Sequence, residues 1–131
     1  MQRLDGYSIL IVDDDIDILE SFELAMRAEG ARTAKATDGT EAISRSYEEM
    51  PDAIILDMML PKRSGFLVLE ELQNMDSPPM VIMVTANEGK RHMAYAKSLG
   101  VAAYLLKPVS LDRLIETVSS VLKDSSKISH E

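Results

Sequence analysis

Hydrophobic and polar positions along the chain follow two alternating patterns. Short apolar runs of strand length are separated by longer segments in which apolar residues recur at helical spacing. The runs lie at residues 9–12, 32–36, 53–56, 80–84 and 103–106. The pattern therefore predicts a strand followed by a helix, repeated five times.

The composition of the predicted strands indicates how they are arranged. Apart from RTAKA at residues 32–36, the runs are almost continuously apolar, which is typical of strands in a parallel sheet that helices cover on both faces. RTAKA is more polar, so we expect it at an edge of the sheet. Alternating strands and helices with short connections imply right-handed crossovers. We therefore predict an α/β fold, a three-layer doubly wound sandwich with a parallel sheet.

Residues that favour helix ends support this assignment. Aspartate, serine or glycine marks the expected starts and ends of helices at Asp15 or Asp17, Gly30, Asp38, Ser64, Gly100 and Ser110. Asp38 and Glu41 have the spacing of a capping box, with Asp in the place of Ser or Thr. The clearest helix follows Ser110, because apolar residues recur at helical spacing from Leu111 to Leu122.

The last residues of the chain differ from the rest. After Leu122 the segment KDSSKISHE is polar and has no apolar face, so burial cannot offset the entropy lost on ordering it. A chain of 131 residues, 46% of them hydrophobic, is sufficient for one core and too short for two ordinary domains. We therefore expect one domain at residues 1–123 and a disordered polar tail at residues 124–131.

Composition and charge exclude several kinds of function. The chain has no cysteine, which excludes disulfides, thiolate metal sites and a cysteine nucleophile. Its net charge of −8 and the scarcity of Lys/Arg clusters argue against direct contact with nucleic acid. The apolar runs are far shorter than the roughly 20 residues of a membrane span, and the N-terminus MQRLDGYS lacks the features of a secretory signal. We therefore expect a cytoplasmic protein with no membrane partner.

Polar residues follow the predicted strands at the edge where a doubly wound sheet binds its ligands. Asp13 and Asp14 follow the first strand, Asp57 the third, Thr85 the fourth and Lys107 the fifth. Three carboxylates at one edge repel each other unless a cation neutralises them. Oxygen ligands suit Mg²⁺, or Mn²⁺ in its place, and no His or Cys nearby suggests zinc.

These groups together form a clamp for a phosphoryl group, whose oxygens need positive charge and hydrogen-bond donors. Asp57 is then the nucleophile that forms an acyl phosphate. Taken singly, each residue has a simpler explanation: an aspartate after a strand is usually a helix cap, and Thr85 or Lys107 is usually a turn residue. Their joint placement at successive strand ends is what favours a site.

The motifs at these strand ends resemble the receiver domain of response regulators, including the chemotaxis regulator. They read IVDDD at residues 11–15, ILDMMLPKRSG at 55–65, VTA at 84–86 and YLLKP at 104–108, and the resemblance covers residues 8–122. It implies a flavodoxin-like (βα)5 sheet with strand order 2-1-3-4-5. It also implies that Asp57 is the phosphoacceptor of a two-component signalling switch.

The resemblance further assigns a role to each residue of the metal site. Asp14 would bind Mg²⁺ directly, and Asp13 would act through the water shell of the metal. Asp57 and the backbone carbonyl of Met59 would complete the protein ligands.

Four further residues have roles by the same resemblance. Lys107 and Thr85 would contact the phosphoryl oxygens, and the small Ala86 would leave room for the phosphoryl group. Thr85 would move toward that group while Tyr104 fills the space it leaves, which reshapes the neighbouring surface. A simple core aromatic with a hydrated hydroxyl is the alternative for Tyr104. The Lys107–Pro108 peptide bond is expected to be cis.

The partners follow from this reading. His92 and His130 have no recognisable phosphodonor context, so the phosphoryl group would come from a partner histidine kinase or histidine phosphotransfer protein. The changed surface would bind a protein target that the sequence does not identify. We expect slow hydrolysis of the protein's own acyl phosphate and no multiple-turnover enzyme activity on an external substrate.

Two other functions remain open at this point. The first is a degenerate receiver that binds partners without phosphorylation. The second is a phosphohydrolase similar to haloacid dehalogenases, because Asp13, Asp15 and Asp17 form a DxDxD motif after the first strand. Asp17, however, occupies the position at which that family has Thr or Val, and the chain has no candidate cap domain. Turnover of a generic phosphatase substrate discriminates between the switch and this enzyme.

Overall fold

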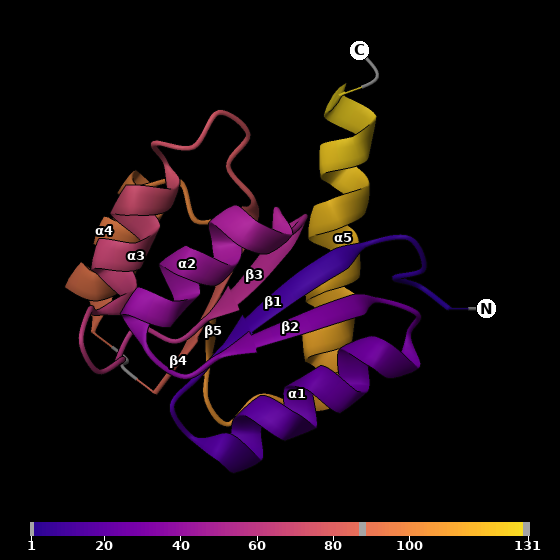
Figure 1. Cartoon of the computed structure of the whole chain (residues 1–131), viewed down its shortest axis with the longest axis horizontal. Coiled ribbons are helices and arrows are strands. Elements are labelled where there is room, and N and C mark those ends of the chain that lie inside the picture. Colours follow the sequence, from indigo (N-terminus) through magenta and orange to yellow (C-terminus); the bar gives the residue numbers. More distant parts are fainter. Residues whose placement is uncertain (1, 87–88, 130–131) are drawn as a thin grey trace.

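Strand and helix alternate five times along the chain (Figure 1). The computed structural model describes residues 2–86 and 89–129, with side chains described as far as Asp124. Within these residues the elements are β1 (Ser8–Val12), α1 (Ile16–Ala28), β2 (Arg32–Ala36), α2 (Gly39–Glu49), β3 (Ala53–Leu56), α3 (Gly65–Leu72), β4 (Met80–Thr85), α4 (Lys90–Ser98), β5 (Ala103–Leu106) and α5 (Leu111–Ser129).

The strands form one parallel sheet in the order β2-β1-β3-β4-β5. The predicted α/β class and strand order are therefore confirmed. The polar segment RTAKA is β2 and pairs with β1 alone, so it is the edge strand that its composition predicted. The other strands match their predicted bounds to within one residue. None of the described helices is long and apolar enough to cross a membrane.

Helices cover both faces of the sheet because alternate strand residues point to opposite sides. In β1, Ile9 and Ile11 pack into a cluster with residues of α1 and α5, whereas Leu10 and Val12 pack into a second cluster with residues of α2, α3 and α4. All four are almost fully buried, and each such side chain contributes about 1.5–3 kcal/mol. Figure 1 shows the same division, with α1 and α5 on one side and the other helices opposite.

The predicted capping residues lie at helix ends. Asp15, rather than Asp17, caps α1, because its carboxylate accepts hydrogen bonds from the backbone N–H groups of Asp17 and Ile18 at 3.0 and 3.3 Å. Asp38, Ser64 and Ser110 accept from backbone N–H groups of α2, α3 and α5 in the same way. The Asp15 carboxylate is therefore engaged by the backbone at the start of α1.

The last helix is longer than predicted. The polar composition predicts that the ordered domain ends at residue 123 and that residues 124–131 are disordered, whereas the backbone of α5 remains helical to Ser129. No glycine or proline interrupts this stretch, so the polar residues continue the helix without a stop signal. Residues 130 and 131 lie outside the described part of the chain, and the domain boundary at 123 stays a prediction.

Candidate functional site

Three carboxylates meet at the carboxyl edge of the sheet. Asp13 follows β1 and Asp57 follows β3, and these strands are neighbours in which Val12 pairs with Leu56. One carboxylate oxygen from each of Asp13, Asp14 and Asp57 lies within 4.8 Å of the others. Asp13 and Asp57 are buried, whereas Asp14 is exposed. The cluster is therefore closed by the sheet on one side and open to water at Asp14.

Lys107 bridges the two buried carboxylates. Its Nζ donates to Asp13 Oδ2 at 2.7 Å and to Asp57 Oδ2 at 3.2 Å. The second oxygen of each carboxylate accepts a backbone hydrogen bond, from Asp15 N to Asp13 Oδ1 at 2.9 Å and from Met59 N to Asp57 Oδ1 at 3.2 Å. Both carboxylates are therefore oriented by donors on two sides. The Lys107–Pro108 peptide bond is cis, as expected.

The electrostatics of the cluster show competing effects. Burial raises the pKa of Asp57, and the charge of Asp13 adds to this rise. The hydrogen bond from Met59 N–H and the charge of Lys107 lower the pKa, but only in part. Burial by itself lowers the pKa of Lys107, but the hydrogen bond and charge of Asp13 and the charge of Asp57 outweigh it and raise that pKa. Lys107 therefore stays protonated at neutral pH. The ionisation of Asp57 is less favourable in the folded protein than in water.

The donor set fits a hard divalent cation. The three groups offer oxygen atoms alone, and one of them faces water, which leaves positions for water ligands of the kind Mg²⁺ retains. Among the described residues this is the one group of three or more potential ligands close enough to share an ion. Asp13, Asp14 and Asp57 can therefore hold Mg²⁺. The predicted role of the Met59 carbonyl stays a prediction, although Met59 N–H already touches Asp57.

Thr85 and Tyr104 lie on neighbouring strands. Thr85 pairs with Leu106 and Met83 pairs with Tyr104, so alternation places the Thr85 and Tyr104 side chains on the same face of the sheet. Thr85 is fully buried. Tyr104 is half-buried and packs against the cluster that includes Ala96 of α4, and burial raises the pKa of its hydroxyl. The register thus places the two predicted switch residues one strand apart beneath α4.

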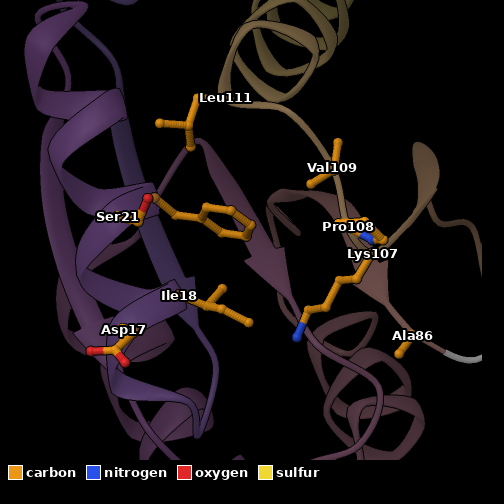
Figure 2. A pocket seen from close by; sticks show the side chains of 9 residues that line it. Asp17, Ile18, Ser21, Ala86, Lys107, Pro108, Val109 and Leu111 are labelled. Carbon is orange, nitrogen blue, oxygen red and sulfur yellow. The ribbon is translucent and has the colours of Figure 1, made fainter.

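A groove next to Lys107 was not predicted from the sequence. It has a volume of about 560 Å³ and lies between α1 and the segment that follows β5 (Figure 2). Its lining residues are Asp17, Ile18, Ser21, Phe22, Ala86, Lys107, Pro108, Val109 and Leu111. Ile18 and Phe22 lie on the core-facing side of α1, and their helical spacing alone does not reveal that the end of this face stays open.

The DxDxD motif does not assemble as a site. Asp13 belongs to the carboxylate cluster, but Asp15 caps α1 and Asp17 lines the exposed groove. The three side chains therefore lie in different environments and do not form one site. This arrangement does not support the interpretation as a dehalogenase-like phosphohydrolase.

Comparison with known proteins finds similar sequences over most of the chain. Residues 9–119 match the family model of the response regulator receiver domain. The transcriptional regulatory protein PrrA of Mycobacterium tuberculosis is 36% identical over 115 residues, which are 88% of this chain and 49% of that protein. The probable transcriptional regulator ycf27 of Guillardia theta is 35% identical over 119 residues, 91% of this chain and 46% of that protein. The chain spans about half the length of the curated relatives it matches.

Solved structures extend the match to three dimensions. A CheY-like receiver domain protein of Methanospirillum hungatei superimposes with a TM-score of 0.88 at 29% identity, covering 92% of this chain and 97% of that one. CheY from Borrelia burgdorferi, solved in a complex with CheX, BeF3 and Mg²⁺, gives a TM-score of 0.84 at 25% identity, covering 89% of this chain and 90% of that one.

Proposed function

The chain belongs to the family of response regulator receiver domains, whose general function is a phosphorylation switch in signalling, and we propose that this domain accepts a phosphoryl group on Asp57 with the help of Mg²⁺. The observation that carries the proposal is the bridge from Lys107 Nζ to the buried carboxylates of Asp13 and Asp57 at 2.7 and 3.2 Å. A nucleophile, a cation site and a fixed positive charge are thereby combined at one edge of the sheet.

The phosphoryl group would come from the phosphohistidine of a partner histidine kinase or phosphotransfer protein. An oxygen of Asp57 attacks the phosphorus atom, the new P–O bond forms as the P–N bond breaks, and the imidazole of the partner takes up a proton as it leaves. Lys107 can follow the negative charge from Asp57 to the phosphoryl oxygens while its bond to Asp13 holds it in place.

Bound Mg²⁺ would add positive charge beside the phosphoryl oxygens, and Mn²⁺ would substitute for it. Asp14 and Asp57 would hold it directly together with the Met59 carbonyl, and Asp13 through its water shell. Water attack on the acyl phosphate later releases phosphate and restores the carboxylate, so each cycle consumes the domain's own modification. We propose no external substrate.

The switch would act through Thr85 and Tyr104. The Thr85 hydroxyl would bind a phosphoryl oxygen beside Ala86, and Tyr104 would move into the space that opens beneath α4. The shared face of these two side chains supports this step. The surface of α4 and β5 would then bind a protein target.

The groove beside Lys107 suits the phosphodonor partner. Ile18, Phe22 and Val109 give it an apolar lining, while Asp17 adds negative charge at the start of α1. A partner with an apolar helix face and basic residues around its phosphohistidine matches this chemistry. The net charge of −8 supports a protein rather than a nucleic acid as the direct partner of this domain.

The proposal is tested by incubating the protein with acetyl phosphate, with and without Mg²⁺, and measuring the intact mass. We expect one phosphoryl adduct that requires Mg²⁺ and is lost in Asp57→Asn. Asp76→Asn, a change at an exposed aspartate away from the cluster, is the matched control and should form the adduct. A folded, Mg²⁺-binding protein that forms no adduct would instead be an interaction module that works without phosphorylation. Steady turnover of a generic phosphatase substrate would indicate the phosphohydrolase.

A further inference from the structure

The loop between β3 and α3, residues 57–64, carries the predicted metal ligands Asp57 and Met59 and is closed at its end by Gly65. Gly65 N donates to the Met58 carbonyl at 2.7 Å. A Cβ on Gly65 would overlap the Asp57 carbonyl oxygen and lie 2.6 Å from Met58 Cα. The first turn of α3 is therefore pressed directly against the backbone of the phosphoacceptor, and a glycine is required there.

A second glycine holds the other side of the same loop. Gly39, the buried first residue of α2, donates its N–H to the Pro61 carbonyl at 3.2 Å. A Cβ on Gly39 would overlap the Arg63 carbonyl oxygen and lie 2.6 Å from Arg63 Cβ and 2.8 Å from its carbonyl carbon. Because the overlap is with backbone atoms, no side-chain rotation relieves it. Gly39 is required for space, since its φ is not in the left-handed region.

Two further observations describe how the loop meets the start of α2. Lys62, between the two residues that Gly39 touches, has a φ of 67°, which is left-handed and uncommon outside glycine. Its Nζ also lies 3.5 Å from the carboxylate of Asp38, the residue before Gly39. The loop is therefore bent toward the start of α2 and attached there by a backbone hydrogen bond and an ion pair.

Only a short run of backbone separates the contact of Gly39 with Pro61 and Arg63 from the candidate metal site. Met59 lies two residues before Pro61, and its N–H donates to Asp57 at 3.2 Å. A displacement of Pro61 and Arg63 by a side chain at residue 39 must move the Met59 backbone or strain the loop, because Gly65 holds the opposite end. Close packing transmits such a displacement along the short run of backbone to Met59.

We infer that Gly39 is a positioning residue for the cation site. Because Gly39 has no side chain, Pro61 and Arg63 can pack against the start of α2, and this packing positions the Met59 backbone and the Asp57 carboxylate to bind Mg²⁺. The inference rests on the proposed Mg²⁺ site and adds a residue from α2, an element with no side chain in the carboxylate cluster. Groups that orient metal ligands typically affect metal affinity by 10–100-fold.

The test compares Gly39→Ala with Thr40→Ala, which changes the exposed neighbour of Gly39 in the same helical turn. Mg²⁺ affinity is measured by titration calorimetry, and the free energy of unfolding by urea without metal. We expect Gly39→Ala to weaken Mg²⁺ binding about tenfold and to raise by the same factor the Mg²⁺ concentration that half-saturates phosphorylation. At saturating Mg²⁺ its phosphorylation rate should return to within about twofold of wild type, and Thr40→Ala should match wild type throughout.

The outcomes separate the inference from the proposed function. If Gly39→Ala is less stable but binds Mg²⁺ as wild type does, Gly39 serves helix packing alone and the inference is wrong. If wild type does not bind Mg²⁺, the proposed metal site is wrong as well. Should Gly39→Ala not fold, Lys62→Gly and Lys62→Asn replace it: both remove the charge and tolerate the left-handed backbone, but glycine loosens it more. Weaker Mg²⁺ binding in the glycine variant supports the inference, and equal binding overturns it.

Discussion

Lys107 Nζ lies 2.7 Å from Asp13 Oδ2, although the two residues are 94 positions apart in the chain. Asp13 follows β1 and Lys107 follows β5, and β3 and β4 lie between these strands in the sheet. The lysine side chain therefore spans the carboxyl edge and meets Asp57 on the way, at 3.2 Å. The charge balance of the site depends on this one long side chain.

Replacing Lys107 with Met should affect stability, metal binding and phosphorylation in different directions. Two buried carboxylates lose their counter-charge, so the metal-free protein should lose about 3 kcal/mol of unfolding free energy. Mg²⁺ should bind several-fold more tightly, because a competing cation is gone, whereas phosphorylation by acetyl phosphate should slow strongly. Urea unfolding, titration calorimetry and intact mass measure the three effects, with the exposed Lys123→Met as control. Weaker Mg²⁺ binding in Lys107→Met would contradict this account.

Asp57→Asn should stabilise the metal-free protein at neutral pH. The pKa of Asp57 is raised in the folded state, chiefly by burial. Above the folded-state pKa, the ionised carboxylate therefore lowers the free energy of unfolding. This destabilisation vanishes as the pH falls below the ordinary pKa of 3.8, because Asp57 is then protonated in both the folded and the unfolded state. We expect a gain of roughly 1 kcal/mol at pH 7.5 that shrinks as the pH approaches 4. Thermal unfolding of both proteins in a chelator measures it. An equal gain at both pH values would rule out the ionisation of Asp57 as the cause.

Met59→Asn should shorten the lifetime of the phosphorylated form. Met59 is 63% exposed and lies beside Asp57, the proposed phosphoacceptor, where its apolar side chain would impede the attacking water. A polar amide admits and orients that water, so hydrolysis should be several-fold faster. The loss of the adduct is followed by mass after the phosphodonor is removed. Met50→Asn, at another exposed methionine, is the control, and an unchanged lifetime in Met59→Asn would refute the prediction.

Thr85→Ala should separate phosphorylation from its structural consequence. The variant keeps Asp57, the carboxylate cluster and Lys107, so the adduct should still form, within a few-fold of the wild-type rate. The response of α4 and β5 should be lost, because the hydroxyl that we propose to bind a phosphoryl oxygen is absent. Amide NMR spectra with and without acetyl phosphate and Mg²⁺ report this response, with the α5 change Thr117→Ala as control. Wild-type Tyr104 ring signals that do not respond to phosphorylation would favour the simple core aromatic.

The candidate site could be predicted from the sequence where it depends on the ends of strands. Parallel strands bring their carboxyl ends to one edge, so Asp13, Asp57 and Lys107 could be expected together from the sequence. The strand order itself came from family resemblance, because the periodicity of a strand does not tell which neighbour it pairs with. The choice between Asp15 and Asp17 as the cap of α1 also required coordinates, since both have suitable side chains.

What the sequence determined by itself is the set of strands and helices and the polar residue after each strand, because hydrophobic periodicity and capping are local properties of the chain. Only the tertiary structure decided which groups touch across that edge. Three features join segments that are far apart in sequence: the hydrogen bond from Lys107 to Asp13, the groove beside α1, and the close contact between Gly39 and Arg63. Such contacts depend on packing between whole elements at sub-ångström tolerance, which no local pattern of residues specifies.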